Sequence, residues 1–345
     1  MNKIFVLVLL ALSFVLVGFN FFKKKENLSE IEQVEKKKVM STLLELGNKQ
    51  PNHFIEKTDP ILVKKGEQLI FKGQIDKGVF NSKKISTYFV CVDCHSTKRE
   101  TRNTKLDTPE ERLDYSMKNK QPYLPASTFW GMYNRKSWYN GDYVKKYGNI
   151  INDVKDDLRK SIDFCANYCS AGRNLKEWEI EAILHYLKSL ELSIKDIPLD
   201  GNTKMDLSNI DSLTKRQREK ISLTIENSYT SAVPATFLPT LPVEKRGMGK
   251  NGNPVRGKYL YNQACMYCHQ GSRVTFLNLE EDQLSVRMFM KNLDNYTDES
   301  IYQIVRQGTY TMAGRNQYMP LYTKERMSDS QIEDIVTYLK TLAKK

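Results

Sequence analysis

The most constraining feature of this 345-residue sequence is a pair of C-x-x-C-H motifs, Cys91–His95 and Cys265–His269. This spacing is typical of c-type haem attachment, because each of two thiols three residues apart can bond a vinyl group of the porphyrin. The histidine that follows is then the proximal ligand of the iron. The motifs therefore predict two covalently bound haem c groups. The assigned residues are Cys91, Cys94 and His95 for the first haem, and Cys265, Cys268 and His269 for the second.

Few side chains remain that can complete the coordination of two irons. The chain has 6 Cys and 4 His, and the residues outside the motifs are Cys165, Cys169, His53 and His185. His53 follows Pro51-Asn52, so we expect it in a surface loop. His185 falls on the expected polar face of its helix. Neither histidine is therefore favoured as a ligand.

The two halves of the chain share a pattern. Segments 178–190 and 330–342 align at a constant offset of 152 residues, and both have apolar residues at i, i+3, i+4 and i+7. This period predicts an amphipathic helix at the end of each half. Gly66 and Gly257 stand in similar segments that precede the two motifs. Each half therefore has the order helix, C-x-x-C-H motif, variable middle, C-terminal helix.

That order resembles a class I cytochrome c domain repeated in tandem, and the resemblance is close over residues 254–345. Gly257–Tyr261 resembles the first helix of the family, Tyr318–Pro320 its distal-ligand loop, and Ser328-Asp329 the N-cap of its last helix. The resemblance implies an all-α fold of two cytochrome c-like domains. It also implies Met319 as the sixth ligand of the second haem, with Met312 as the alternative. A thioether ligand raises the reduction potential of the iron.

The first half departs from this pattern at the distal position. The offset of 152 places Asn167, which is not a haem ligand, opposite Met319, and Cys165 and Cys169 lie on either side of it. The pattern predicts a thiolate ligand on the first iron, Cys165 or alternatively Cys169, and a thiolate lowers the reduction potential. Other possibilities stay open: a disulfide between the two cysteines, inert buried thiols, or a different ligand. The candidates for a different ligand of the first haem are Met117, Met132 and His185.

The segment Cys165–Leu175 is also similar to the distal-ligand segment of the dihaem thiosulfate dehydrogenases. In that family a haem-ligating Cys stands seven residues before a Gly and ten before a Leu, which matches Cys165, Gly172 and Leu175. The resemblance implies Cys165 as a catalytic residue and thiosulfate as a substrate. Residues 167–171 depart from the Arg-Ser-Met type of stretch expected there, which puts catalysis in doubt. A more distant resemblance, to a thiosulfate-oxidising cytochrome subunit with a sulfur-modified haem Cys, favours Cys169.

The first half also contains extra residues, around 123–148, that are rich in aromatic side chains. The same stretch carries the cations Arg135, Lys136, Lys145 and Lys146. Aromatic walls with cations suit an anion pocket above the first haem. The other interpretation is an insertion that packs against the haem edge or between domains.

The N-terminal residues 4–22 are almost continuously apolar. As a helix they would span about 28 Å, close to the thickness of the hydrocarbon core. We expect an uncleaved anchor, with a cleaved signal peptide as the alternative. Because haem is attached to such motifs outside the cytoplasm in bacteria, the predicted location is the periplasm, at the inner membrane.

The expected domain boundaries follow from these segments. They are 1–22 for the anchor or signal peptide, 23–60 for a charged helical spacer, 61–195 for the first cytochrome c domain with its insertion, 196–250 for a linker, and 251–345 for the second cytochrome c domain. Within the linker we expect a helix over 213–226 and an extended strap over 231–242.

The formal net charge of +12 limits the classes of partner. No basic helix with interleaved aromatic residues is present, so nucleic acid is not expected. A cationic surface instead favours an acidic redox partner or anionic lipid.

The sequence predicts electron transfer through a low-potential His/Cys haem and a high-potential His/Met haem. The alternative is a thiosulfate dehydrogenase that forms tetrathionate, or a related sulfur-anion oxidoreductase; whether the chain is an enzyme stays open. The shortage of His disfavours a dihaem peroxidase.

Overall fold

The computed structural model describes residues 30–75, 82–105, 108–272, 274–280, 283–309 and 319–344. Over these residues the regular structure is helical and contains no strand, only two isolated bridges. The all-α prediction is therefore confirmed. Among the described helices, none has the length and apolar character needed to cross a bilayer. The predicted membrane segment 4–22 lies outside the described residues.

The chain divides into two compact units. The described part of the first unit comprises residues 30–50 and 192–229, with helices α2 (Val39–Glu45), α9 (Gly201–Ser208) and α10 (Lys215–Glu226). Leu43, Leu207 and Ile225 are buried there. The helix expected over 213–226 is confirmed as α10. The predicted domain boundaries stay predictions.

The second unit comprises residues 51–191 and 230–344 and contains both C-x-x-C-H motifs. The strap over 231–242 is free of helix, as expected. The helices of this unit are α3 (Pro60–Lys72), α4 (Pro109–Asn119), α5 (Tyr143–Tyr147), α6 (Ile150–Val154), α7 (Leu158–Phe164), α8 (Glu177–Ser189), α11 (Pro254–Leu260), α12 (Met266–His269), α13 (Gln283–Lys291), α14 (Ile301–Gln307) and α15 (Asp329–Ala343).

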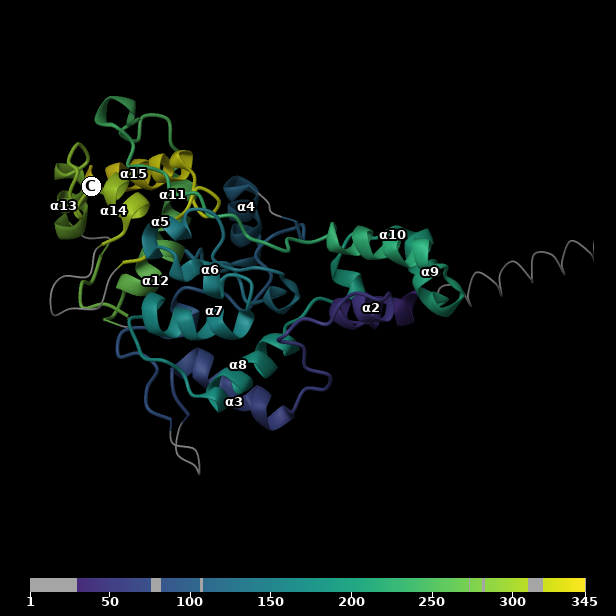
Figure 1. The fold of residues 1–345 in the computed structure, drawn as a ribbon. Helices are drawn as coiled ribbons and strands as arrows, with labels where there is room; N and C mark the ends of the chain where they lie inside the picture. The colour runs from purple at the N-terminus through teal and green to yellow at the C-terminus, as the bar shows by residue number, and fades with distance from the viewer. Residues whose placement is uncertain are drawn as a thin grey trace, which may run out of the picture. The chain divides into compact units, whose positions relative to one another are not determined.

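Two helix pairs in the second unit cross at glycines (Figure 1). Where α3 meets α8, a Cβ atom on Gly66 would lie 2.0 Å from the carbonyl oxygen of Ala182. Where α11 meets α15, a Cβ atom on Gly257 would lie 1.9 Å from the carbonyl oxygen of Asp334. Any larger residue would separate the backbones, so glycine sets the close approach in both pairs. The two facing residues, Ala182 and Asp334, are 152 positions apart, which is the offset found in the sequence.

The two C-terminal helices of these pairs begin differently. Ser328 caps α15, because its Oγ accepts the Gln331 N–H at 3.3 Å, and the predicted N-cap is confirmed. The residue at the start of α8 is Lys176, whose side chain makes no capping bond. There the carboxylate of Glu179 accepts the Lys176 N–H at 2.8 Å. Helix α15 thus has both bonds of a capping box, since Oε1 of Gln331 also accepts the Ser328 N–H at 3.2 Å, whereas α8 has only the bond to Glu179.

The two histidines outside the motifs are buried, so the predictions of a surface loop for His53 and of a polar helix face for His185 were wrong. His53 is 5% exposed and its Nε2–H donates to the carbonyl oxygen of Tyr133 at 3.0 Å. His185 is 8% exposed and its Nδ1 accepts the Asp59 N–H at 3.0 Å. Residues far along the chain cover each ring, which the local sequence does not reveal.

Candidate haem centres

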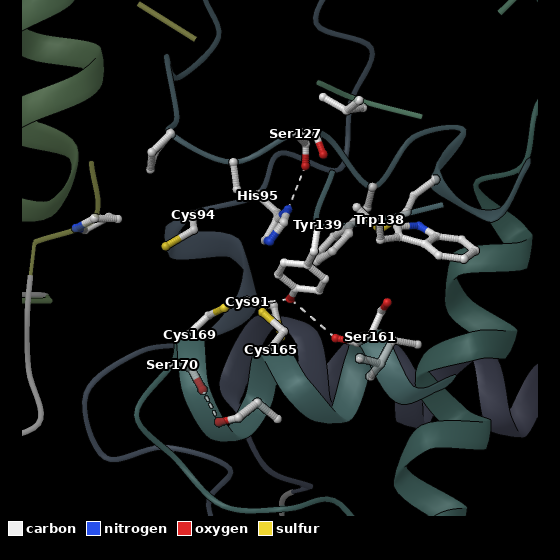
Figure 2. Close-up of a pocket in the computed structure, with 18 of the residues that line it drawn as sticks. Cys91, Cys94, His95, Ser127, Trp138, Tyr139, Ser161, Cys165, Cys169 and Ser170 are labelled. Carbon is white, nitrogen blue, oxygen red and sulfur yellow. Dashed lines mark hydrogen bonds between the residues drawn. The ribbon is translucent and has the colours of Figure 1, made fainter. Parts of the chain in front are cut away.

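The first C-x-x-C-H motif lies at the wall of a cavity of about 210 Å³. The motif forms a tight turn in which the His95 N–H donates to the carbonyl oxygen of Cys91 at 3.0 Å. The buried carboxylate of Asp93 accepts the Val90 N–H at 2.8 Å and holds the entry to this turn. Cys91, Cys94 and His95 all line the cavity (Figure 2). Both cysteines are free thiols, as covalent attachment requires.

The imidazole of His95 has a fixed orientation. Its Nδ1–H donates to the carbonyl oxygen of Ser127 at 2.6 Å, and since a carbonyl only accepts, the proton is on Nδ1. The lone pair of Nε2 is then available to a metal, which is the usual arrangement of a metal-binding histidine. Phe129 stacks on the ring at 4.5 Å. Burial lowers the pKa of His95 to about 4, so the ring is neutral near pH 7.

Cys165 and Cys169 also line this cavity. They lie on a π-helical turn, Cys165–Cys169, that continues α7, and the Ser170 N–H donates to the carbonyl oxygen of Cys165 at 2.8 Å. Figure 2 shows both side chains pointing from this turn toward the part of the cavity that contains His95. Single π-helical turns are frequent at functional sites. Both cysteines are free, so no disulfide joins them in this structure.

The two cysteines differ in their polar surroundings. Cys165 donates a hydrogen bond to Cys169. The Sγ of Cys169 also lies within hydrogen-bond distance of two hydroxyls, 3.5 Å from that of Tyr147 and 3.7 Å from that of Tyr139, which itself donates to the carbonyl oxygen of Ser161. The bond from Cys165 is the largest cause that lowers the pKa of Cys169, and it raises the pKa of Cys165. Of the two sulfurs, Cys169 therefore holds a negative charge more easily.

The aromatic residues of the insertion form much of the cavity wall. The members that line it are Phe129, Trp138, Tyr139, Tyr143 and Tyr147, joined by Phe237 from the strap. Among the alternative ligands for the first haem, Met132 lines the cavity, whereas Met117 packs against the core of the C-terminal helices. His185 is bound to Asp59 and is absent from the lining.

A buried charge cluster adjoins the cavity. Glu100 lies 2.9 Å from Nη1 of Arg326 and 3.6 Å from Nε of Arg112. Burial by itself would raise the pKa of Glu100, but the charges of the two arginines hold it below its usual value. Arg326 and a second buried cation, Arg135, line the cavity itself.

The second motif repeats the arrangement of the proximal histidine. The Nδ1–H of His269 donates to the carbonyl oxygen of Leu277 at 2.7 Å, which again leaves Nε2 for a metal. Burial lowers the pKa of His269. Cys265 and Cys268 are free thiols at the end of a π-helical turn, Tyr261–Cys265, and within α12.

Met319 has a fixed backbone. Its N–H donates to Oγ1 of Thr309 at 2.6 Å, and its carbonyl oxygen accepts the Thr309 N–H at 3.0 Å. A Cβ atom on Gly308, which has a φ of +63°, would lie 2.2 Å from that carbonyl oxygen, so glycine is required for this pairing. Met312, the alternative ligand, lies outside the described residues.

The two motifs contact each other directly. The Tyr267 hydroxyl donates to the carbonyl oxygen of Val92 at 3.2 Å, and Sγ of Cys268 donates to the carbonyl oxygen of Asp93 at 3.9 Å. Pro320 and Leu321, which follow Met319, line the cavity of the first motif. This contact could not be predicted from the sequence, because it joins residues 175 positions apart.

Each motif offers two free thiols and an imidazole with a free Nε2, a donor set that fits haem c. With the helical fold, this arrangement indicates a protein of the c-type cytochrome class. Residues 252–339 match a family model described as cytochrome c oxidase, cbb3-type, subunit III. The match supports a c-type cytochrome domain at these residues, and with it covalently bound haem c and a role in haem-based electron transfer. No curated protein and no solved structure matches the chain.

Proposed function

We propose that this chain is a dihaem c-type cytochrome, built from two tandem cytochrome c-like halves, that transfers electrons between redox partners. The residues that would hold the two cofactors are Cys91, Cys94 and His95 in the first half, and Cys265, Cys268 and His269 in the second. Haem c, when bound, supplies a one-electron iron couple at each motif. The protein supplies attachment, orientation of the imidazoles, and the distance between the two sites.

The observation that carries this proposal is the contact between the two motifs. The hydrogen bond from the Tyr267 hydroxyl to the carbonyl oxygen of Val92 does not use an attachment thiol, so it can hold the two turns together with both haems attached. Electron tunnelling weakens steeply with distance, so turns in contact favour transfer between the two sites. The matched glycine crossings, Gly66 on Ala182 and Gly257 on Asp334, support the tandem organisation.

The distal ligands are the finer part of the proposal. On the first iron we propose the thiolate of Cys165, because of its spacing to Gly172 and Leu175. The alternative is Cys169, which the hydrogen bond from Cys165 favours as the charged sulfur. On the second iron we propose the thioether of Met319. The first haem would then have the lower reduction potential and the second the higher. Supporting this, both cysteines line the cavity that contains His95, and the backbone of Met319 is fixed by Thr309.

Electron paramagnetic resonance on the oxidised full-length protein tests these ligands. We expect two low-spin ferric signals, one of them of the thiolate type, and intact-mass measurement should find two haems per chain. Cys165→Ser should remove the thiolate signal and Cys169→Ser should leave it. The reverse result would assign Cys169, and a wild-type spectrum without a thiolate signal would refute a cysteine ligand.

The partners and the location are also proposals. We propose a periplasmic protein, anchored to the inner membrane through residues 4–22, with a cationic surface that meets an acidic redox partner. The name of the matched family makes a terminal oxidase one candidate for the electron acceptor. Reduction of the protein by candidate donors should slow as salt is added, because salt screens such a contact.

A second candidate function is oxidation of thiosulfate to tetrathionate at the first haem. The observation that favours it is the shared cavity of His95, Cys165 and Cys169 with its aromatic wall. Thiosulfate added with ferricyanide should then give turnover that Cys165→Ala abolishes while both haems stay attached. If thiosulfate leaves the haems oxidised, electron transfer alone remains.

A further inference from the structure

Arg135 is a buried cation on the wall of the first cavity. The residue follows the short turn Met132–Asn134 and is 9% exposed. Its Nη1 donates to Oγ of Ser127 at 2.8 Å and its Nη2 to the carbonyl oxygen of Thr128 at 3.2 Å. Both acceptors are neutral, so these bonds orient the guanidinium without balancing its charge.

No acidic residue in the described part of the chain forms an ion pair with Arg135. The carboxylate whose charge acts on the pKa of Arg135 is that of Glu100. This carboxylate already forms ion pairs with Arg326 at 2.9 Å and with Arg112 at 3.6 Å. The pKa of Arg135 is lowered to about 10, chiefly by burial and in smaller part by the charge of Arg326, while the charge of Glu100 opposes the shift. An unbalanced buried cation is unfavourable, so the fold favours an anion at this place.

The position of Arg135 relative to the proximal histidine narrows the identity of that anion. Ser127 accepts from both groups: its carbonyl oxygen binds Nδ1–H of His95 and its hydroxyl binds Arg135. The guanidinium of Arg135 and the imidazole of His95 are therefore both held by hydrogen bonds to the segment Ser127-Thr128. A guanidinium has five N–H donors, of which these two bonds use two, and its planar fork suits a carboxylate.

Resting on the proposed attachment of haem c at Cys91 and Cys94, we propose that Arg135 binds a propionate carboxylate of that porphyrin. A porphyrin of this type carries two such carboxylates, and the cavity lined by the attachment cysteines is also lined by Arg135. Two other cations line the same cavity: Arg326 is engaged by Glu100, and Lys146 is exposed and lies over the ring of Tyr147. Arg135 is therefore the buried cation that we assign to the porphyrin.

Loss of the Arg135 charge then has a defined consequence for the first iron. An unbalanced carboxylate stabilises the ferric state, so one of the two midpoint potentials falls. An opposite charge within about 4–6 Å lowers the pKa of a carboxyl by about one to three pH units, so loss of the Arg135 charge should raise the pH of the redox-linked protonation by a similar amount. The other charged and titratable groups of this cavity and its edge are unchanged in the variant; they are Arg326, Glu100, His95, Lys146, and the tyrosines and cysteines of the lining.

The test is a set of variants of the full-length protein with its haems, Arg135→Gln, Arg135→Lys and Lys136→Gln. Intact mass counts the haems, and spectropotentiometric titration over pH 5 to 9 gives both midpoint potentials. Arg135→Gln should keep two haems, lower one midpoint potential and raise the pH of its redox-linked protonation by about one to three units. Arg135→Lys keeps the charge but loses the fork, so the same changes should appear at smaller size. Lys136→Gln removes a charge from an exposed neighbour and should match the wild type.

Three results would overturn the inference. Potentials and pH curves in Arg135→Gln equal to those in Lys136→Gln would give Arg135 a purely structural role. If Arg135→Gln fails to fold, Arg135→Lys takes its place in the test. Unchanged midpoint potentials and pH curves in Arg135→Lys would then also give Arg135 a purely structural role. A wild-type shift on adding thiosulfate or phosphate, absent in the Arg135 variants, would show that the cation binds a free anion. An absence of haem at Cys91 and Cys94 in the wild type would refute the proposed function instead.

Discussion

The two motif regions use one proximal arrangement and two different distal ones. In both, the histidine donates its Nδ1–H to a backbone carbonyl, at 2.6 Å for His95 and 2.7 Å for His269. Opposite His95 lies a π-helical turn with two thiols and an aromatic wall. The second region instead has the Met319 segment, paired with Thr309 inside the matched cytochrome c domain. The donor set that fits haem c is thus kept in both motifs, while the residues around the two motifs differ.

The largest expected effect comes from removing the attachment cysteines of one region at a time. Cys91→Ala with Cys94→Ala should leave one haem per chain, and Cys265→Ala with Cys268→Ala should do the same, because each pair forms its own thioether bonds. Intact mass and absorbance per protein measure both. If Cys91→Ala with Cys94→Ala carries as much covalent haem as the wild type, the first motif does not attach haem. Only the second region would then be a haem centre.

The link between the regions gives the next largest effect. Glu100 belongs to the first region and its partner Arg326 to the second, and both are buried. Glu100→Gln leaves two buried arginines without their counter-charge, so unfolding by denaturant should require about 3–5 kcal/mol less free energy. Glu177→Gln, which removes an exposed partner of Arg159, is the control and should cost under about 1 kcal/mol.

The same ion pair predicts a pH dependence. The pKa of Glu100 is lowered in the folded protein, since the effect of its arginines exceeds that of burial. Its stabilisation is therefore present above the unfolded value of about 4.3 and is lost as the pH falls through the folded value. Between pH 5 and pH 2 the stability of the wild type should fall more than that of Glu100→Gln. If the stabilities of the wild type and of Glu100→Gln fall by the same amount over this pH range, the charge of Glu100 does not stabilise the contact between the two regions.

A smaller effect tests whether the two helix pairs are equivalent. Gly66→Ala and Gly257→Ala each place a Cβ atom about 2 Å from a facing carbonyl oxygen. Each should cost about 1–3 kcal/mol in denaturant unfolding, because the helices must separate. Gly201→Ala, at a position with nothing within 4 Å, is the control and should be close to neutral. If Gly66→Ala behaves like the control, the crossing of α3 with α8 is not the counterpart of α11 with α15.

What the sequence could predict was local or periodic. The spacing of apolar residues identified α8, α10 and α15, and the Ser328 cap was visible because its partner Gln331 is three residues away. The offset also pointed to the neighbourhood of Cys165 and Cys169, whose role as ligands stays a prediction. What it could not predict depends on distant partners. The burial of His53 against Tyr133, the bond from Tyr267 to Val92 and the unbalanced charge of Arg135 each require the folded backbone.

The smallest expected effect distinguishes the starts of the two C-terminal helices. Ser328→Ala removes the hydroxyl that accepts the Gln331 N–H, so we expect a loss of about 1 kcal/mol in denaturant unfolding. Lys176→Ala at the start of α8 should change stability by less than about 0.5 kcal/mol, since the Glu179 carboxylate still accepts the backbone N–H of that residue. Ser328→Thr keeps a hydroxyl that can accept the Gln331 N–H and donate to Glu110, so it should retain most of the stability. Equal effects of the two alanine variants would mean that the caps do not differ in energy, and the asymmetry of the two halves would then be confined to the distal side of the haem centres.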